Sequence, residues 1–306
     1  MRERKSILIT GASRGLGRTM ALDLAGRGYT VFAGVRRNED GSALVAAGGD
    51  NVRPLILDVI SVHSIDSALA EVHRQLGGAN LSGLVNNAAI FLLGPVEQTP
   101  LGAVENLFRV NVTGVVAVTQ AFLPMLRGAK GRIVNVSSVN GRLSFPFSSF
   151  YSASKFAIEA LSDALRVELS PWGIEVSVVE PGATRTDIRA EGARAWEESR
   201  GRLTPDEQEF YAAPFAGFQD ILPQIDSGAA DHHYVADAVY RALTEDPPAT
   251  RYLAGPDTEQ WLRLASVPDR QRDREFIAML AQRGSAGLAN GGDRRLPNQP
   301  SADEVS

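Results

Sequence analysis

The chain has 306 residues, 44% hydrophobic and 22% charged, a composition typical of a globular protein with a sizeable core. Its formal net charge of −5 at pH 7 excludes the basic surface with which proteins neutralise nucleic-acid phosphates, so we expect no nucleic-acid partner. The lack of cysteine excludes disulfides, thiol catalysis and thiolate metal sites, and is compatible with a reducing compartment.

The sequence contains no segment that predicts export or membrane insertion. Its start, MRERKSILITGAS, has an apolar stretch that is too short for the hydrophobic region of a signal peptide. No later window reaches the roughly 18 uninterrupted apolar residues that a membrane helix needs. We therefore expect a cytoplasmic protein that does not bind a membrane.

Short apolar runs alternate with amphipathic stretches along most of the chain. The runs predict strands at 6–10, 30–35, 52–59, 81–89, 131–138, 174–182 and 250–255. Between them, helical patterns are clearest at 16–27, 101–127, 151–169 and 235–243. Apolar strands that alternate with helices are typical of a parallel sheet covered on both faces. We therefore predict a doubly wound α/β fold of the Rossmann type, whose ligands bind at the carboxyl ends of the strands.

Regular alternation stops after Gly182, but nothing there marks a second core. We predict one domain over 1–283, which includes a substrate loop at about 187–230 and a C-terminal helical extension at about 256–283. The last segment, 284–306, is rich in glycine, proline and polar residues and is expected to be disordered.

Three glycines, Gly11, Gly15 and Gly17, lie between the first strand and the first helix in TGASRGLG. Such glycines let the backbone turn tightly and approach a pyrophosphate, whose charge is met by the amides at the start of the helix. The alternative is an ordinary turn without a ligand. Because a strand precedes the motif and a helix follows it, we favour dinucleotide binding.

This glycine spacing, G-x3-G-x-G, resembles that of the short-chain dehydrogenase/reductase family. Further motifs of that family follow in order: DV at 58–59, NNAA at 86–89, Asn111, NVSS ending at Ser138, YSASK at 151–155 and PGATRTD at 181–187. The resemblance covers roughly residues 5–255, and the family usually has NNAG where this chain has NNAA. It implies a Rossmann-fold oxidoreductase that acts on CH–OH groups.

The end of the second strand indicates which dinucleotide binds. NAD sites usually carry an acid there to bind the ribose 2′-hydroxyl. Here Val35 is followed by Arg36 and Arg37, and Arg14 lies in the glycine turn. Guanidinium groups bind a 2′-phosphate well, so we predict NADP(H), with NAD(H) as the alternative. The arginines could instead be solvated surface charges, the reading we prefer for Arg37.

Other cofactor contacts are implied by the resemblance. Asp58 would hold the adenine amino group beside Val59, the turn after the fourth strand would line the cofactor, and residues after the sixth strand would hold the carboxamide. The full set of predicted contacts is Gly11, Ser13, Arg14, Gly15, Leu16, Gly17, Arg36, Asp58, Val59, Asn86, Asn87, Ala88, Ala89, Tyr151, Lys155, Pro181, Gly182, Thr184 and Thr186.

The reactive residues are expected around Tyr151. Lys155 follows it by four residues, so both side chains share one face of a helix that begins at the carboxyl edge of the sheet. The lysine ammonium favours the phenolate, which suits Tyr151 to act as general acid/base. By resemblance, Ser138 binds the substrate oxygen and Asn111 holds a water that links Lys155 to solvent. Ser137 is the competing serine, and Asn111 could also be an ordinary buried amide.

Aromatic side chains flank this tetrad of Asn111, Ser138, Tyr151 and Lys155. Phe91, Phe145, Phe147 and Phe150 are candidates for a substrate wall, although they could equally pack in the core. The loop after Thr186 and the C-terminal helices are expected to contribute to the same wall. The segments around the tyrosine resemble hydroxysteroid and retinol dehydrogenases, which implies a bulky apolar ketone, aldehyde or alcohol of steroid, retinoid or polyketide type. Glu180 is expected to be structural, and the four histidines have no metal-binding spacing.

Two functions of different classes remain open at this point. The first is an NADP(H)-dependent ketoreductase, and the second is a non-catalytic NADP-binding sensor or scaffold with the same fold. A sensor does not need the complete tetrad, so we favour the enzyme. By resemblance, the helices at 101–127 and 151–169 form the contacts of a homodimer or homotetramer.

Overall fold

A computed structural model describes residues 5–184, 188, 191–192, 194, 197–198, 201, 203–212, 216–218 and 229–284. Much of the segment expected as a substrate loop therefore lies outside the described residues. The same is true of Thr186 and of all the expected tail except Gly284, with which the last described helix ends.

A seven-stranded parallel sheet forms the centre of the protein, in the order β3-β2-β1-β4-β5-β6-β7. The strand order reverses direction at β1 and β4, as in the predicted doubly wound fold. The strands are β1 (Ser6–Ile9), β2 (Thr30–Val35), β3 (Val52–Ile56), β4 (Gly83–Asn86), β5 (Arg132–Val136), β6 (Glu175–Pro181) and β7 (Arg251–Ala254).

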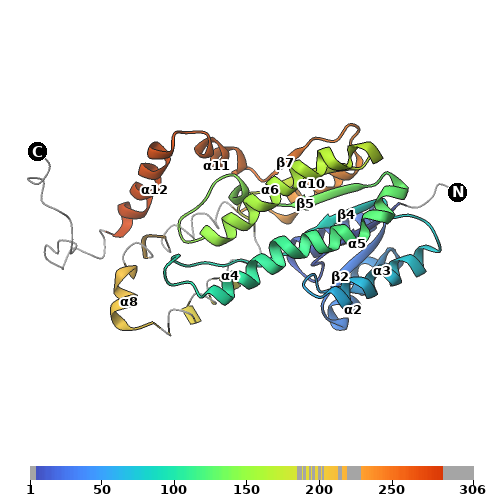
Figure 1. Cartoon of the computed structure of the whole chain (residues 1–306), viewed down its shortest axis with the longest axis horizontal. Helices are drawn as coiled ribbons and strands as arrows, with labels where there is room; N and C mark the ends of the chain where they lie inside the picture. Colours follow the sequence, from blue (N-terminus) through green and yellow to red (C-terminus); the bar gives the residue numbers. More distant parts are fainter. Residues whose placement is uncertain are drawn as a thin grey trace, which may run out of the picture.

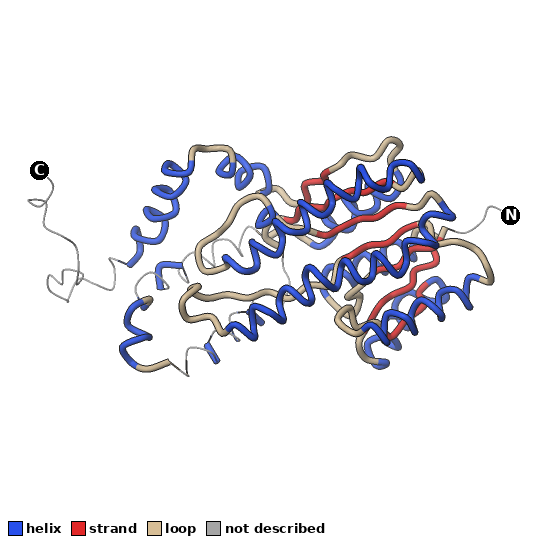
Figure 2. Tube along the Cα trace, in the orientation of Figure 1, coloured by secondary structure: helices blue, strands red, loops and turns tan. Residues whose placement is uncertain are grey.

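Helices cover both faces of the sheet (Figures 1 and 2). The described helices are α1 (Gly15–Gly26), α2 (Asn38–Gly48), α3 (Val62–Leu76), α4 (Leu101–Phe108), α5 (Gly114–Ala129), α6 (Ser149–Leu169), α8 (Pro205–Phe210), α10 (His232–Thr244), α11 (Thr258–Ala265) and α12 (Asp269–Gly284), of which α8 and α12 lie beyond the sheet. Short turns of 3-10 helix lie at Gly49–Asn51, Val139–Gly141 and Ser170–Trp172.

Alternating side chains of the strands build two separate cores. Ile7 and Ile9 of β1 pack with α1, α2 and α10, whereas Leu8 between them packs on the opposite face with α3 and α5. In β2, Phe32 joins the second core while its neighbours Val31 and Ala33 join the first. This alternation is what a strand buried on both faces requires, and it explains why the strands read as continuous apolar runs.

The predicted element types are confirmed, and several boundaries differ. The strand predicted to run to residue 59 ends at Ile56, and the one predicted over 81–89 is only Gly83–Asn86, because the following residues turn toward the cofactor side. The helix predicted over 101–127 is interrupted by a π-helical turn at Arg109–Thr113. The helix predicted from residue 235 begins at His232, with Asp231 as its N-cap.

The strands end toward α8, α11 and α12, on the side of the molecule opposite the N-terminus (Figure 1). Among the described residues, one helical stretch, Leu101–Ala129, is long and apolar enough to cross a membrane by length and composition alone. Val118, Phe122 and Leu126 of this stretch belong to the second core, so part of its apolar character serves packing on the sheet.

Candidate active site

Two cavities meet at the carboxyl ends of the strands. The larger, about 340 Å³, runs from the glycine turn past the ends of β2 and β4 to β5 and α6. The smaller, about 110 Å³, lies beside it and is lined mainly by aromatic and other apolar side chains. Five residues line both cavities: Ser138, Tyr151, Gly182, Thr184 and Ile188. A group in one cavity can therefore meet a group in the other only at this shared boundary.

The glycine turn has a conformation that side chains would prevent. Gly11 has φ +67°, and a Cβ atom there would lie 2.8 Å from the Cα of Ala88. A Cβ at Gly17 would lie 2.6 Å from Nδ2 of Asn87, which itself donates to the carbonyl oxygens of Thr10 (2.9 Å) and Gly11 (3.1 Å). The glycines are thus needed for the close approach of the β1 and β4 turns, which form one wall of the larger cavity.

The beginning of α1 fits the pyrophosphate of a dinucleotide. Its N-cap residue, Arg14, provides no side-chain cap to the first amides, and the first turn contains no acidic residue. These amides border the larger cavity with the positive end of the helix dipole. The free amides and the helix dipole favour an anionic group at this place, so the residues present fit the pyrophosphate of the predicted cofactor.

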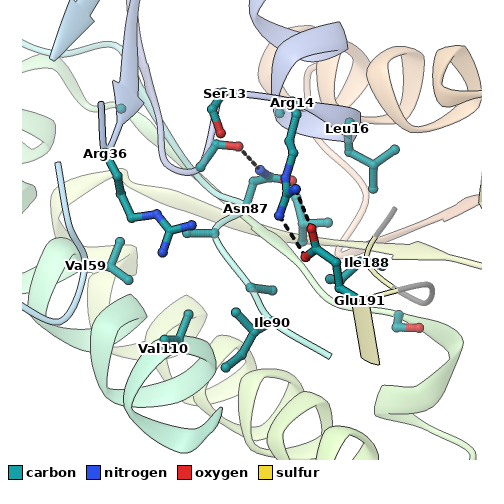
Figure 3. A pocket seen from close by; sticks show the side chains of 18 of the residues that line it. Ser13, Arg14, Leu16, Arg36, Val59, Asn87, Ile90, Val110, Ile188 and Glu191 are labelled. Carbon is teal, nitrogen blue, oxygen red and sulfur yellow. Dashed lines mark hydrogen bonds and ion pairs between the residues drawn. The ribbon is translucent and has the colours of Figure 1, made fainter. Parts of the chain in front are cut away.

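The three arginines near the adenine end differ in their surroundings. Arg36 lines the cavity beside Val59 (Figure 3). Arg37 is 72% exposed and donates to Asp40 at 2.8 and 3.0 Å, which lowers the pKa of that carboxyl through the hydrogen bonds. Arg14 lines the cavity and is paired with Glu191 from the segment after β6. Arg36 therefore faces the cavity, whereas Arg37 is a surface charge, which is the interpretation that we preferred from the sequence.

Of the two neighbouring asparagines at the end of β4, Asn86 and Asn87, only the second lies on the cofactor side. Asn87, Ala88 and Ala89 line the larger cavity. Asn86 does not: its amide donates to Asn135 (2.9 Å) and Thr119 (3.0 Å) in the core, because strand alternation turns it away from its neighbour. Our expectation for Asn86 was therefore wrong. Ala89 replaces the usual glycine without a positive φ, a conformation found among described non-glycine residues only at Lys130 and Phe147.

Lys155 is buried beside Tyr151 on α6. Its Nζ donates to the carbonyl oxygen of Val136 (2.8 Å) and lies 5.6 Å from the centre of the Tyr151 ring. Burial lowers the pKa of Lys155 to about 8, opposed by the carboxylate of Glu159 one turn further along the helix. The ammonium form therefore still predominates at pH 7, but it loses its proton far more readily than an exposed lysine does.

Ser138 rather than Ser137 faces both cavities. Its Oγ lies 3.4 Å from Oδ1 of Asn140 and 3.4 Å from the carbonyl oxygen of Pro181, to either of which it can donate, and it accepts from the Asn140 amide (3.2 Å). Ser137 lines only the larger cavity, and its buried Oγ has no hydrogen-bond partner among the described residues. The geometry favours Ser138 as the serine that meets a substrate oxygen.

Asn111 lies in the π-helical turn and is almost fully buried. Its Oδ1 accepts from the amide of Ile90 (2.8 Å), and its Nδ2 donates to the Ile90 carbonyl (2.9 Å) and to Ser154 (3.1 Å). The side chain thus ties the loop after β4 to α6 next to Lys155. These contacts match our alternative interpretation of Asn111 as an ordinary buried amide, because its partners are largely backbone groups. The π-helical turn is a local distortion of the helix at this residue.

Two of the four predicted wall residues line the smaller cavity. Phe91 lies 4.6 Å from Tyr151 and Phe145 lies 5.0 Å from Trp261, measured between ring centres. Phe147 and Phe150 are not part of the lining, contrary to our expectation. Phe147 lies behind the wall instead, since its ring packs at 5.3 Å on Phe218, which does line the cavity.

The C-terminal extension supplies individual wall residues that the sequence pattern did not single out. Trp261 of α11 lines the smaller cavity, and its Nε1 donates to Asp257 (3.1 Å). The same carboxylate oxygen accepts from the amide of Ala183 (3.1 Å), beside the Gly182 turn. Phe276 of α12 packs on Phe145 at 5.6 Å. The one available signal was the amphipathic pattern of 257–265 with its single tryptophan.

The other predicted contacts also lie on the larger cavity. These are Ser13, Gly15, Leu16, Asp58, Val59, Pro181, Gly182 and Thr184. In the described part of the chain, no three His, Cys, Asp or Glu side chains are grouped as metal ligands.

Comparison with known proteins gives close relatives over most of the chain. A family model described as short chain dehydrogenase matches residues 5–197. The 17-beta-hydroxysteroid dehydrogenase type 6 of Bos taurus is 38% identical over 264 residues, 83% of this chain and 82% of the relative. The mitochondrial D-beta-hydroxybutyrate dehydrogenase of Rattus norvegicus is 36% identical over 278 residues, 85% and 79%. The NADPH-dependent 3-dehydrocapnine reductase of Ornithobacterium rhinotracheale is 30% identical over 275 residues, 88% and 95%.

Solved structures agree with the fold. A short-chain dehydrogenase from Streptomyces avermitilis superimposes with a TM-score of 0.72 at 31% identity, covering 94% of this chain and 99% of that one. One from Burkholderia cenocepacia in complex with NADP has a TM-score of 0.67 at 26% identity, covering 90% and 98%. The chain therefore belongs to the short-chain dehydrogenase family and, like its relatives, is an oxidoreductase that acts on CH–OH groups.

Proposed function

We propose that the protein interconverts a ketone or aldehyde and an alcohol on a bulky apolar substrate, with NADP(H) as cofactor and Tyr151 as general acid/base. The observation that carries this proposal is the shared boundary of the two cavities. Tyr151 and Ser138 line both the dinucleotide-sized cavity and the apolar one, so a substrate oxygen at this boundary meets both hydroxyl groups.

Side chains of the protein transfer the proton to the substrate oxygen and stabilise the charge that develops on it. A reduced nicotinamide, when bound, supplies the hydride. Tyr151 donates its phenolic proton to the carbonyl oxygen, and Ser138 stabilises the charge that develops on that oxygen. Lys155 lies against the Tyr151 ring, and its ammonium stabilises the phenolate that remains. In the reverse direction the phenolate takes the proton from the alcohol.

Preference for NADP(H) is supported by charge at the adenine end. The strand β2 ends with Val35, which carries no carboxylate to repel a 2′-phosphate. Arg36 and Arg14 both line the cavity, and a phosphate would complement their charge. A relative whose name specifies NADPH and a neighbouring structure with bound NADP agree with this preference.

The composition of the smaller cavity supports a bulky apolar substrate. Phe91, Phe145, Phe218 and Trp261 surround it, and such aromatic walls bind flat hydrocarbon surfaces. Relatives named for hydroxysteroids and retinol are consistent with a steroid- or retinoid-like ligand. The hydroxybutyrate dehydrogenase among the relatives is named for a small acid instead, so the substrate panel must include both classes.

A homodimer or homotetramer is part of the proposal. Leu101 of α4 is 77% exposed and Val167 of α6 is 73% exposed, on the helices that we expect to contact a second copy. The cytoplasmic location stays a prediction, since some relatives are named as mitochondrial enzymes.

The decisive experiment is turnover with Tyr151→Phe. A panel of lipophilic ketones and alcohols, with hydroxybutyrate included, is followed by NADPH absorbance. We expect the substitution to abolish turnover while NADPH still binds with nearly unchanged affinity in a fluorescence titration. Tyr234→Phe is the matched control, because Tyr234 is 54% exposed on α10, and it should remain fully active.

Two outcomes would contradict the proposal. Substantial turnover by Tyr151→Phe would remove the general acid/base assignment. Absence of turnover by the unmodified protein on every compound, with intact NADPH binding, would favour the sensor or scaffold.

A further inference from the structure

A buried cluster of charged groups lies directly behind the candidate active site. Glu159 of α6 is 6% exposed and Glu180 of β6 is fully buried. Both approach Nε of Arg251 on β7, Glu159 at 3.0 Å and Glu180 at 3.4 Å. Arg251 also donates to both carboxylate oxygens of Asp163 at 2.9 Å. The guanidinium of Arg251 thus pairs with three carboxylates, and those of Glu159 and Glu180 are buried.

Glu159 belongs to the same helical ridge as the predicted reactive residues. Tyr151, Lys155, Glu159 and Asp163 follow at intervals of four, so their side chains form one row along α6. Glu159 is therefore the next group after Lys155 in this row, and both are buried. Its negative charge acts to raise the pKa of Lys155 against the lowering effect of burial.

The fold fixes Glu159 in this position. Gly141 packs so closely that a Cβ atom there would lie 3.0 Å from the Cγ of Glu159 and 2.6 Å from the Oγ of Ser137. Oε2 of Glu159 accepts from Nε of Arg251, which leaves Oε1 without a hydrogen-bond partner among the described residues. A buried carboxylate with an unpaired oxygen is costly unless a nearby cation uses its charge.

We propose that Glu159 is a positioning residue for the reaction: held by Arg251, its carboxylate keeps the proton on Lys155, so that Tyr151 is the group that exchanges protons with the substrate. This inference rests on the proposed function for its consequence in turnover, but its electrostatic part can be tested alone. Tyr151 and Lys155 are coupled, and a single proton lost from the pair can come from either group. A negative charge beside the lysine favours the state with ammonium and phenolate.

The other charged groups around Glu159 come from three neighbouring elements. Glu180 of β6 has a pKa raised to about 7, by burial first and then by repulsion from Glu159, so it gains its charge in the neutral range. Arg142, after β5, approaches Glu180 at 3.5 Å, and Arg251 comes from β7. Asp163, half exposed, lies one turn beyond Glu159. None of these groups follows Lys155 directly along the row on α6, which is the position that Glu159 occupies.

The sequence makes a direct test simple, because it contains only three lysines, Lys5, Lys130 and Lys155. NMR spectra of the full-length protein labelled with 13C at the lysine ε-carbon should show three signals, and Lys155→Met assigns the third. We expect Glu159→Gln to lower the pH at which Lys155 titrates by about one pH unit, the smallest effect usual for a neighbouring opposite charge. Glu159→Asp keeps the charge and should largely restore the titration.

Asp163→Asn is the matched control. This substitution also removes a carboxylate that pairs with Arg251 and lies in the same row on α6, but one helical turn further from Lys155. It should leave the pH at which Lys155 titrates unchanged. An unchanged titration in Glu159→Gln, or an equal shift in Asp163→Asn, would overturn the proposal. If Glu159→Gln is too unstable to study, the same comparison is made with Glu159→Met, which also removes the charge but places an apolar side chain of similar length at the buried position, and an unchanged Lys155 titration would again count against the proposal.

Turnover supplies the second readout. With the alcohol that reacts best in the panel, Glu159→Gln should lower kcat by up to about tenfold, the factor that corresponds to one pKa unit, with NADP(H) affinity nearly unchanged. An unchanged kcat would overturn the catalytic part of the inference. If instead Tyr151→Phe stays active while Glu159→Gln still shifts Lys155, the proposed function fails and the electrostatic pairing stands.

Discussion

The buried carboxyl of Glu180 should make the stability of the protein depend on pH in an unusual direction. Burial raises its pKa from the ordinary value of 4.5 to about 7, with repulsion from Glu159 as the second cause. Arg142 and Arg251 oppose this rise only partly, since their distances to Glu180 are 3.5 and 3.4 Å. The folded state therefore binds this proton more tightly than the unfolded state does.

The sign of the effect follows from this difference. Because the folded pKa is raised, the contribution of Glu180 to stability is fully present below pH 4.5 and is lost as the pH rises toward and through 7. A difference of this size corresponds to at most about 3.5 kcal/mol, since one pKa unit is about 1.4 kcal/mol. Arg142 is half exposed and admits water near the cluster, so we expect roughly 1–2 kcal/mol in practice.

The assay is urea unfolding of the unmodified protein and of Glu180→Gln, at pH 5 and at pH 8. Glutamine resembles the protonated acid, so the two proteins should be similar at pH 5. At pH 8 the variant should be more stable than the unmodified protein by roughly 1–2 kcal/mol. Glu175→Gln, at an exposed position of the same strand, controls for general charge effects. The reasoning is refuted if the stability difference between Glu180→Gln and the unmodified protein is the same at both pH values.

Four further outcomes can be measured on the purified protein. Arg36→Gln should weaken NADPH binding by about 10- to 100-fold without affecting NADH, as expected for a lost charged hydrogen-bond partner, whereas Arg37→Gln should change neither in the same titrations. Glu191→Gln should tighten NADPH binding by about two- to fivefold, because an exposed ion pair worth about 0.2–1 kcal/mol no longer competes for its arginine; weaker binding would show that the pair assists instead. Ser138→Ala should lower kcat by about 10²- to 10³-fold in steady-state assays, and a change confined to KM would assign it to binding alone. Trp261→Ala should raise KM for bulky apolar substrates with little effect on NADPH affinity, and an unchanged KM would place the substrate elsewhere.

Local patterns sufficed for the fold and for the common face of Tyr151 and Lys155, whereas Ser138 and Asn111 were identified by resemblance. Apolar runs of strand length, alternating with helices, specified the sheet, and the four-residue spacing of Tyr151 and Lys155 specified their common face. Both signals depend on residues close together in the chain. The glycine turn likewise acts within one strand–helix connection, where Gly11 and Gly17 meet the neighbouring turn.

Features that depend on distant parts of the chain could not be predicted. Trp261 reaches the smaller cavity only because Asp257 bonds to the backbone after β6, and no local pattern encodes that contact. Phe147 has the right type and position for a wall residue, but it packs behind Phe218, a residue 71 positions further along the chain that takes the place at the cavity. The burial of Glu159 requires an arginine that is 92 positions away.

The bonds of Asp257 matter for any attempt to exchange parts between relatives. One carboxylate oxygen holds both the indole of Trp261 and the backbone beside Gly182, so the first turn of the extension also supports the wall on the cofactor side. A chimera that joins a foreign C-terminus directly after β7 would remove this support together with the native substrate wall. A junction placed beyond Trp261 would keep it, which makes α12, rather than the whole extension, the natural unit to swap when specificity is to be altered.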